Sequence, residues 1–242
     1  MKKCVILQPS YIPWRGYFHL IQKSDVFIFY DDVQYDKHGW RNRNRVKSRS
    51  GSQWLTIPVH SRGNVLEHTP INRILIDWKQ PWARKHHETL KQNYARSPFY
   101  AEYTAMLSQF FSHRHEFLSD FTIEITIAIA RALGIEHTVF LRSSELALAQ
   151  SSANSPTERL VDIIKSVGSD HYISGPAAKD YLDSEKLNAA GIAVEWMVYD
   201  YPGYDQLYPP FDPFVTVLDL MFMQGANAST YIWRQPAAGA QK

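Results

Sequence analysis

The sequence predicts an α/β protein with a Rossmann-like, three-layer fold: a mostly parallel sheet interrupted by a helical insertion. Two observations carry this prediction. An apolar run at residues 4–7, an amphipathic helix and a second apolar run at residues 26–30 follow one another, which is the order of a βαβ unit. Helices and short apolar strands alternate again after residue 155. The chain has 242 residues, of which 45% are hydrophobic, so it is long enough for one large domain with an insertion.

The first sixty residues contain three predicted strands and one helix. Pro9 and Pro13 bracket a loop after the first strand. The helix that follows is indicated by apolar residues at positions i, i+3, i+4 and i+7, namely Trp14, Tyr17, Phe18 and Ile21. A third strand is expected at residues 53–59 after a turn at Gly51. Pro58 should lie at its end or on an edge, because proline lacks an N–H.

The middle of the chain is mainly helical in pattern. We expect one helix from Pro81 or Trp82, another after Pro98, and a third at residues 117–133 that Gly134 ends. In the third segment isoleucine alternates at positions 123, 125, 127 and 129, which is also a strand pattern. The length of the segment and the glycine after it favour a helix.

The last part opens with a capping box at residues 155–158, serine at the N-cap and glutamate at N3. We expect a helix to Gly168, a strand at 171–174, a helix to Gly191, a strand at 192–199 and a final helix at 214–223. The predicted parts are an N-terminal α/β half with the site at 1–77, a helical insertion at 78–135 and a C-terminal α/β half at 136–234. Residues 235–242 are predicted to be a disordered tail.

Composition narrows the classes of partner and location. The 26 basic and 24 acidic residues give a net charge of +2, so we expect no nucleic-acid partner. The longest apolar run, around residues 121–130, is interrupted by polar residues and predicts no membrane span. A single cysteine, Cys4, permits no intrachain disulfide; it should be buried in the first strand, and a reducing cytoplasm is the expected location. The oligomeric state is not specified by these features.

The segment after the first strand is the first candidate for a binding site. Ligands of open α/β sheets lie at the carboxyl ends of strands, and helix N-termini attract anions. Gln8 should end the first strand, while Gly16 should begin the helix. The alternative is a proline-ordered turn with packed aromatic side chains. The site interpretation predicts substrate-binding roles for Gln8, Tyr11, Trp14 and Gly16, and a catalytic role for Tyr17.

A second polar cluster ends the next strand. Asp31 and Asp32 are the predicted catalytic residues, because a carboxylate there can accept sugar hydroxyls, bind Mg²⁺ or act as a base. Strand alternation allows only one of them to point each way. Gln34 and Lys37 follow as predicted substrate-binding residues.

The third candidate is a basic stretch with a tryptophan. Arginine binds phosphate or carboxylate through two parallel hydrogen bonds, and Trp40 can stack on a planar or sugar ring. Arginines at 41, 43 and 45 would share one face of a strand. Anionic-ligand binding is favoured over a solvated edge or nucleic acid. The predicted binding residues are Trp40, Arg41, Asn42 and Arg43.

Other motifs contribute less. The pairs His86–His87 and His113–His115 lack cysteine partners and HExxH spacing, so we interpret them as surface histidines and predict no resident metal. The sequence contains no Walker A, GxGxxG or GxSxG motif. Ser174 and Gly175 form a strand-to-helix corner, suited either to tight packing or to a phosphate, and are included among the predicted substrate-binding residues.

Several blocks of the chain resemble the WbqC-like protein family. They are QPSYIPWRGYF at 8–18, DDVQY at 31–35, WRNR at 40–43, WLTIPV at 54–59, YISG at 172–175, YL at 181–182, Tyr204 with Gln206, and VLDL at 217–220. The resemblance covers nearly all of the chain to about Gly225. It implies an association with bacterial O-antigen and surface-polysaccharide biosynthesis, and a candidate reaction in which an amino acid such as glycine is transferred to a sugar.

The layout of the first strands is more distantly similar to HxGH nucleotidyltransferases such as pantothenate synthetase. In those enzymes two histidines stabilise the phosphates of ATP, and Trp14 and Tyr17 occupy the corresponding places here. Tryptophan carries no charge and tyrosine is a neutral donor near pH 7, which argues against adenylyl transfer.

Together these features predict a transferase or ligase that acts on a sugar-linked or nucleotide-linked anionic small molecule. A nucleotide or nucleotide sugar, with or without Mg²⁺, is the expected cofactor class. The alternative is a non-catalytic binding or scaffold protein of the same pathway. Both hypotheses require the first two strand ends and the arginine segment to meet at one pocket.

Overall fold

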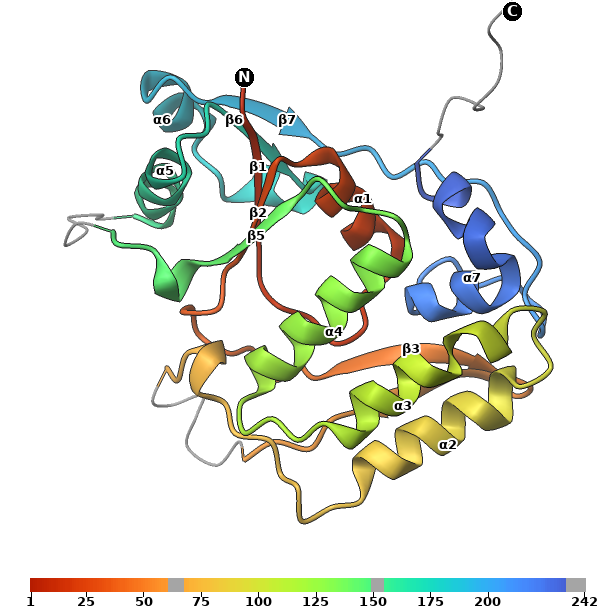
Figure 1. The fold of residues 1–242 in the computed structure, drawn as a ribbon. Helices are drawn as coiled ribbons and strands as arrows, with labels where there is room; N and C mark the ends of the chain where they lie inside the picture. Colours follow the sequence, from red (N-terminus) through yellow and green to blue (C-terminus); the bar gives the residue numbers. More distant parts are fainter. Residues whose placement is uncertain (61–67, 149–154, 234–242) are drawn as a thin grey trace, which may run out of the picture.

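A sheet of five parallel strands forms the centre of the protein (Figure 1). The computed structural model describes residues 1–60, 68–148 and 155–233. The strand order is β5-β2-β1-β6-β7, so successive strands are added to one side of β1 and then to the other. This reversal between β1 and β6 is the topological switch of a doubly wound sheet, and it confirms the predicted α/β fold. The strands are β1 Lys3–Leu7, β2 Val26–Phe29, β5 Val139–Arg142, β6 His171–Ser174 and β7 Ala193–Trp196.

Helices cover both faces of this sheet and make three layers. Val5 and Phe27 belong to the core shared with α1 (Arg15–Lys23) and α4 (Leu118–Ala132). The alternate residues, Cys4 and Ile28, belong to the core shared with α5 (Pro156–Ser166) and α6 (Ser184–Ala189). Cys4 is buried as predicted, and burial raises the pKa of its thiol to about 11.

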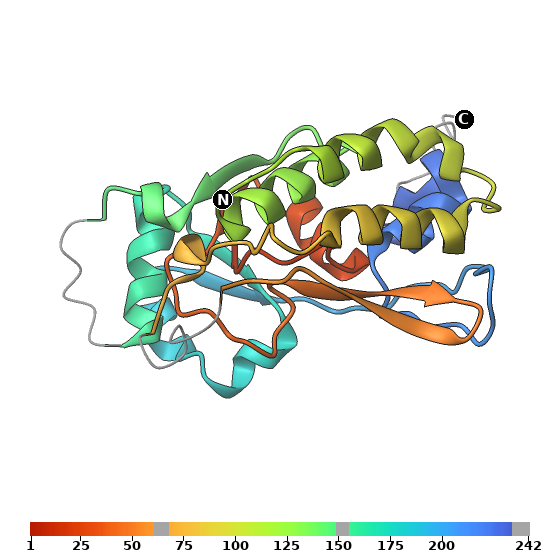
Figure 2. The ribbon, with the colours of Figure 1, turned by 90° about the horizontal axis from the view of Figure 1, so that it is seen from below.

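A hairpin and two helices are inserted between β2 and α4. Strands β3 (Arg43–Ser48) and β4 (Gly51–Thr56) pair with each other as a separate antiparallel sheet, and Figure 2 shows them running alongside α2 (Trp82–Tyr94) and α3 (Thr104–Ser112). The strand predicted at 53–59 therefore exists in part, but it lies outside the parallel sheet. A two-residue turn at 49–50 joins it to β3, which favours antiparallel pairing.

The segment with alternating isoleucines is a helix. Ile123, Ile125 and Ile129 are all buried in α4. The threonines between them do not need a sheet partner, because Thr122 Oγ1 donates to the Leu118 carbonyl at 2.9 Å and Thr126 Oγ1 donates to the Thr122 carbonyl at 2.8 Å. Since these hydroxyls are satisfied within the helix, the whole face can be buried.

The C-terminal half follows the predicted order with one difference. The Ser155 side chain accepts from the backbone N–H of Glu158 at 3.3 Å, as the capping box requires. The single helix expected between β6 and β7 is two shorter ones, a 3-10 helix at Pro176–Asp180 and α6, whose N-cap is Asp183. The final helix, α7, spans Val217–Gln224 and is capped by Thr216. Further 3-10 helices are Ile71–Arg73, Tyr100–Tyr103, Ser143–Glu145 and Gly225–Tyr231.

A buried polar cluster ties α7 to the hairpin region. Asp219 is fully buried and accepts hydrogen bonds from Tyr94 Oη at 2.9 Å, Tyr204 Oη at 2.8 Å and Gln206 Nε2 at 2.9 Å. The Tyr94 oxygen in turn accepts from the backbone N–H of Lys47 in β3 at 2.8 Å. Burial raises the pKa of Asp219 above its ordinary value.

Two further predictions concern the ends and the surroundings of the chain. The tail predicted at 235–242 lies outside the described residues. Within the described ranges, none of the helices has both the length and the apolar character needed to cross a membrane.

Candidate functional site

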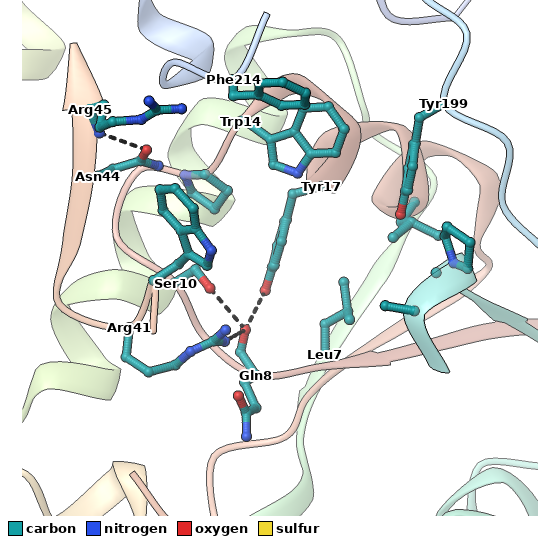
Figure 3. Close-up of a pocket in the computed structure, with 16 residues that line it drawn as sticks. Leu7, Gln8, Ser10, Trp14, Tyr17, Arg41, Asn44, Arg45, Tyr199 and Phe214 are labelled. Carbon is teal, nitrogen blue, oxygen red and sulfur yellow. Dashed lines mark hydrogen bonds between the residues drawn. The ribbon is translucent and has the colours of Figure 1, made fainter. Parts of the chain in front are cut away.

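A cavity of about 680 Å³ opens where the strand order reverses. Leu7 and Gln8 at the end of β1 line one side of it, and Gly175 after β6 lines the other. Parallel sheets of this kind bind ligands at this point, because the loops that leave β1 and β6 turn in opposite directions and leave a crevice. We call this cavity the switch-point pocket (Figure 3).

Aromatic side chains form the walls of the switch-point pocket. The ring of Trp14 lies 5.1 Å from that of Tyr199 at an interplanar angle of 65°, and 6.0 Å from that of Phe214. Trp40 is exposed at the rim and lies beside Trp54, with 5.4 Å between ring centroids. Flat rings at several orientations suit a ligand that contains a base or a sugar ring.

A single backbone carbonyl organises the polar side of the pocket. The carbonyl of Gln8 accepts from Arg41 Nη1 at 3.0 Å, from Tyr17 Oη at 3.1 Å and from Ser10 Oγ at 3.4 Å. Figure 3 shows these three side chains directed toward it. Burial raises the pKa of Tyr17 well above its ordinary value, so the phenol stays protonated near neutral pH and acts as a donor.

Two arginines make the pocket electropositive. Arg41 is partly buried, burial lowers its pKa, and its Nε lies 3.9 Å from Asp36 Oδ2. Arg45 is also partly buried, and its Nη1 lies 3.7 Å from Asp212 Oδ2. The Nε atoms of both arginines are buried and have no hydrogen-bond acceptor among the described residues. No described residue that lines the pocket is an aspartate or glutamate. The carboxylates of Asp36 and Asp212, which face the two arginines, lie outside the lining, so an anionic group in the pocket would meet positive charge there.

The loop between β1 and α1 is held in an unusual conformation. Ile12 has a φ of +40°, which is rare for a β-branched residue. Asn44 of β3 stabilises it, because its side-chain amide donates to the carbonyls of Tyr11 at 3.1 Å and Ile12 at 2.6 Å. The hairpin thus fixes the loop that carries Trp14, and backbone strain of this kind is common at functional sites.

Part of the predicted site is brought together in this pocket. The predicted residues that line it are Gln8, Trp14, Tyr17, Trp40, Arg41 and Gly175. Gly16 contributes indirectly: a Cβ at that position would meet the Trp14 ring at 2.4 Å. Ser174 is buried at the end of β6 and is not in the lining.

The two predicted catalytic aspartates lie elsewhere. Asp31 is fully buried and accepts from Ser144 Oγ at 2.9 Å and Ser143 Oγ at 3.2 Å, beyond the end of β5. Asp32 accepts from Ser143 Oγ at 2.5 Å and forms an ion pair with Arg159 of α5. Their carboxylates are held by these donors and do not line the switch-point pocket.

The remaining predicted residues also have other surroundings. Asn42 is buried and donates to the Ile57 carbonyl at 2.8 Å. The guanidinium of Arg43 lies 4.8 Å over the ring of Trp54 and donates to the His38 carbonyl. The exposed residues Gln34 and Lys37 are not among the lining residues.

The prediction that His86 is a surface residue is wrong. Its ring is buried between Tyr11 and Trp82, and its Nδ1 lies 2.9 Å from the hydroxyl of Tyr11. Burial lowers the pKa of His86 to about 4. Tyr11, predicted to bind substrate, is itself fully buried in this contact and does not line the pocket. Because α2 packs on the core, the histidine that faces inward is covered although its neighbour His87 is partly accessible.

Sequence reasoning left several lining residues out of the predicted site. Asn44 and Arg45 repeat the Arg-Asn alternation of residues 41–43, and this alternation is the sequence signal that could have added them to the site. Tyr199 and Phe214 come from the segment between β7 and α7. No local pattern marks them, because only the folded chain brings that segment back over α1.

Comparisons with known proteins give a consistent result. The model of the WbqC-like protein family matches residues 8–231 of this chain. The chain is 41% identical to the "Uncharacterized protein Rv1507c" of Mycobacterium tuberculosis over 234 residues, which is 96% of this chain and 98% of that protein. No solved structure gives a significant match. The similarity to HxGH nucleotidyltransferases is not shown by these comparisons and stays a prediction.

Proposed function

This chain belongs to the WbqC-like protein family, and on that premise we propose that it is a transferase or ligase acting on a sugar-linked or nucleotide-linked anionic small molecule. The switch-point pocket would bind the ring and the anionic group of that molecule. Asp31 and Asp32 at the end of β2 do not line this pocket, so the expected convergence of both strand ends is not met. The proposal therefore rests on the end of β1 and on Arg41 and Arg45 alone. The family resemblance supports the further proposal that the reaction belongs to O-antigen or surface-polysaccharide biosynthesis and transfers an aminoacyl group such as glycyl.

The observation that carries the proposal is the pairing of two arginines with aromatic walls. Arg41 and Arg45 line the pocket, and the carboxylates that face them, those of Asp36 and Asp212, lie outside its lining. A phosphate or carboxylate oxygen would accept from a guanidinium, and a charged hydrogen bond of this kind contributes roughly 1.5–3 kcal/mol. Trp14 and Tyr199 offer ring faces nearby for the base or the sugar.

We propose Tyr17 as a neutral hydrogen-bond donor in the reaction. It lines the pocket, its hydroxyl already donates to the Gln8 carbonyl, and its raised pKa keeps it protonated. The role of base predicted for Asp31 or Asp32 stays a prediction, since both carboxylates are occupied by serine and arginine donors.

A non-catalytic binding protein of the same pathway is the second candidate. It is favoured by the chemistry of the lining, because no described lining residue is an aspartate, glutamate, histidine, cysteine or lysine. General bases mostly come from these residue types. Binding without turnover is what such a lining would support most simply.

A ligand screen followed by a turnover assay tests the proposal. Nucleotides, nucleotide sugars, sugar phosphates and amino acids are screened by thermal shift. A ligand at about 100 times its dissociation constant should raise the melting temperature by roughly 5–10 °C. Arg45→Gln should weaken the anionic ligand about tenfold to a hundredfold, whereas Arg84→Gln, exposed on α2, should not.

The proposal is contradicted if neutral sugars bind as tightly as their phosphorylated forms, or if Arg45→Gln binds the anionic ligand normally. Incubation of the bound ligand with candidate acceptors, analysed by mass spectrometry, then separates the two candidates. A product identifies a transferase or ligase. Binding with no product from any acceptor favours the non-catalytic protein.

A further inference from the structure

Two histidines and a glutamate meet away from the switch-point pocket. His113 directly follows α3, His115 lies in the connection between α3 and α4, and Glu124 is in the second turn of α4. One ligand atom from each of the three residues lies within 4.8 Å of the others. The short connection between α3 and α4 therefore brings three side chains of metal-binding type close together.

The contacts within the cluster are short and differ in kind. His113 Nδ1 lies 3.1 Å from Glu124 Oε1, and His115 Nε2 lies 2.8 Å from Glu124 Oε2. The Nε2 atom of His115 is buried, yet within the described part of the chain it has no partner with hydrogen-bond geometry. Its contact with the carboxylate is therefore a close approach of the two groups without hydrogen-bond geometry. A cation bound to both atoms would supply the partner that the buried nitrogen lacks among the described residues.

The ligand atoms lie near the separations of a small metal site. Zinc binds imidazole nitrogen and carboxylate oxygen at about 2.0–2.2 Å, which places the ligand atoms of a tetrahedral site roughly 3.3–3.6 Å apart. The observed 2.8 and 3.1 Å are shorter, so the side chains would open by a few tenths of an ångström to admit an ion. Two imidazoles with one carboxylate suit zinc and its neighbours in the transition series, while calcium and magnesium prefer oxygen ligands alone. We propose that His113, His115 and Glu124 bind a divalent transition-metal ion of the zinc type, with solvent in the remaining position.

The surrounding residues already hold the ligands in place. Trp78 Nε1 donates to the backbone carbonyl of His115 at 2.6 Å, and the His115 ring packs on Phe121. Arg114, the nearest basic residue in sequence, has its guanidinium 5.4 Å over the Trp78 ring. The positive charge of Arg114 is therefore directed toward an indole ring. Outer contacts that fix ligand orientation are typical of metal sites.

A bound ion would link the end of α3 to α4. Glu124 is on the helix that packs against the parallel sheet, while His113 belongs to the inserted helices. The ion would thereby join the insertion to the sheet and stabilise the folded state, because it binds the folded arrangement and not the unfolded chain. Spacing alone does not reveal the site, since the glutamate lies nine residues beyond the second histidine.

Titration of the metal-free full chain with Zn²⁺ tests the proposal. Isothermal titration calorimetry should show one tightly bound ion per chain, and Co²⁺ should give a visible absorption spectrum of a four- or five-coordinate site. His115→Ala and Glu124→Gln should each weaken Zn²⁺ binding by at least about a hundredfold. His38→Ala, which removes an exposed histidine elsewhere, should bind as the wild type does.

The Glu124→Gln variant is the control that separates loss of metal binding from loss of folding. Glu124→Gln keeps the size of the side chain, and its metal-free melting temperature shows whether it is folded. In the wild type Zn²⁺ should raise the melting temperature, and in Glu124→Gln it should not. The proposal is overturned if the wild type fails to bind Zn²⁺, or if folded Glu124→Gln and His115→Ala bind it as tightly as the wild type. Neither result would affect the proposed role of the switch-point pocket.

Discussion

The indole of Trp14 lies against the backbone of Gly16 so closely that a Cβ at position 16 would be 2.4 Å from its Cζ2 atom. Trp14 is the N-cap residue of α1, and Gly16 is the second residue of the helix. The absence of a side chain at position 16 therefore allows the indole to fold back over the start of the helix. This contact sets the shape of one wall of the switch-point pocket.

Gly16→Ala should displace the Trp14 ring. Crowding of this kind costs about 1–3 kcal/mol, and the expected result is a lower free energy of unfolding and a changed tryptophan fluorescence. Ligand affinity should fall as well, because the wall moves. Gly203→Ala is the matched control, since a Cβ there has nothing within 4 Å. Equal unfolding free energies and ligand affinities for Gly16→Ala and the wild type would contradict this account.

Tyr17→Phe removes the hydroxyl that donates to the Gln8 carbonyl. The carbonyl keeps its hydrogen bond from Arg41, so the loss of stability should be small, about 1 kcal/mol or less. If Tyr17 donates a hydrogen bond to the reacting group, turnover should fall by about a hundredfold or more with little change in ligand affinity. Tyr181→Phe, at an exposed position, is the control for turnover and binding. Unchanged turnover in Tyr17→Phe would remove the tyrosine from the mechanism.

His86 should make the protein less stable in acid. Burial lowers its pKa from an ordinary value of 6.5 to about 4, so the unfolded state takes up a proton first as the pH falls. The stability is present above pH 6.5 and is lost as the pH falls toward 4, by about 3 kcal/mol for this one group. Urea unfolding at a series of pH values gives the free energy of unfolding as a function of pH. Between pH 6.5 and 4 this free energy should fall less steeply in His86→Gln than in the wild type or in the exposed control His38→Gln. Identical slopes in all three proteins would exclude His86 as the source.

Asp219 should have the opposite dependence. Its pKa is raised by burial, so the folded state binds its proton more tightly than the unfolded state does. The corresponding stability is present below the ordinary carboxyl range and is lost as the pH rises through the raised pKa. Relative to the wild type, Asp219→Asn should therefore become more stable as the pH is raised from 3 to 7. Asp205→Asn, at an exposed position, should show no such change. If the difference in unfolding free energy between the wild type and Asp219→Asn does not change with pH, the raised pKa of Asp219 is contradicted.

Local signals in the sequence were sufficient for most of the elements. The apolar runs that became β1 and β2, the spacing that became α1 and the cap at Ser155 each depend on neighbouring residues. The hairpin of β3 and β4 was half predicted. The sequence predicts its second strand and a shared strand face for Arg43 and Arg45, but no local signal indicates that the two segments pair as antiparallel strands.

The site was predicted less completely than the fold. Which strand ends lie beside each other depends on the order of the strands in the sheet, and the sequence does not show that order. Gln8 and Asp31 do follow adjacent strands, β1 and β2. The pocket, however, opens on the other side of β1, toward β6, where the strand order reverses. Tyr199 and Phe214 reach it from nearly two hundred residues further along the chain. Such contacts have no local periodicity, so the sequence alone could not indicate them.

A crystal structure with the tightest ligand from the screen tests the central claim most directly. The account predicts that the ligand lies in the switch-point pocket, with its anionic group within hydrogen-bond distance of Arg45 or Arg41 and its ring against Trp14 or Tyr199. A ligand bound beside Asp31 and Asp32 instead, with only solvent between Trp14 and Tyr199, would contradict it.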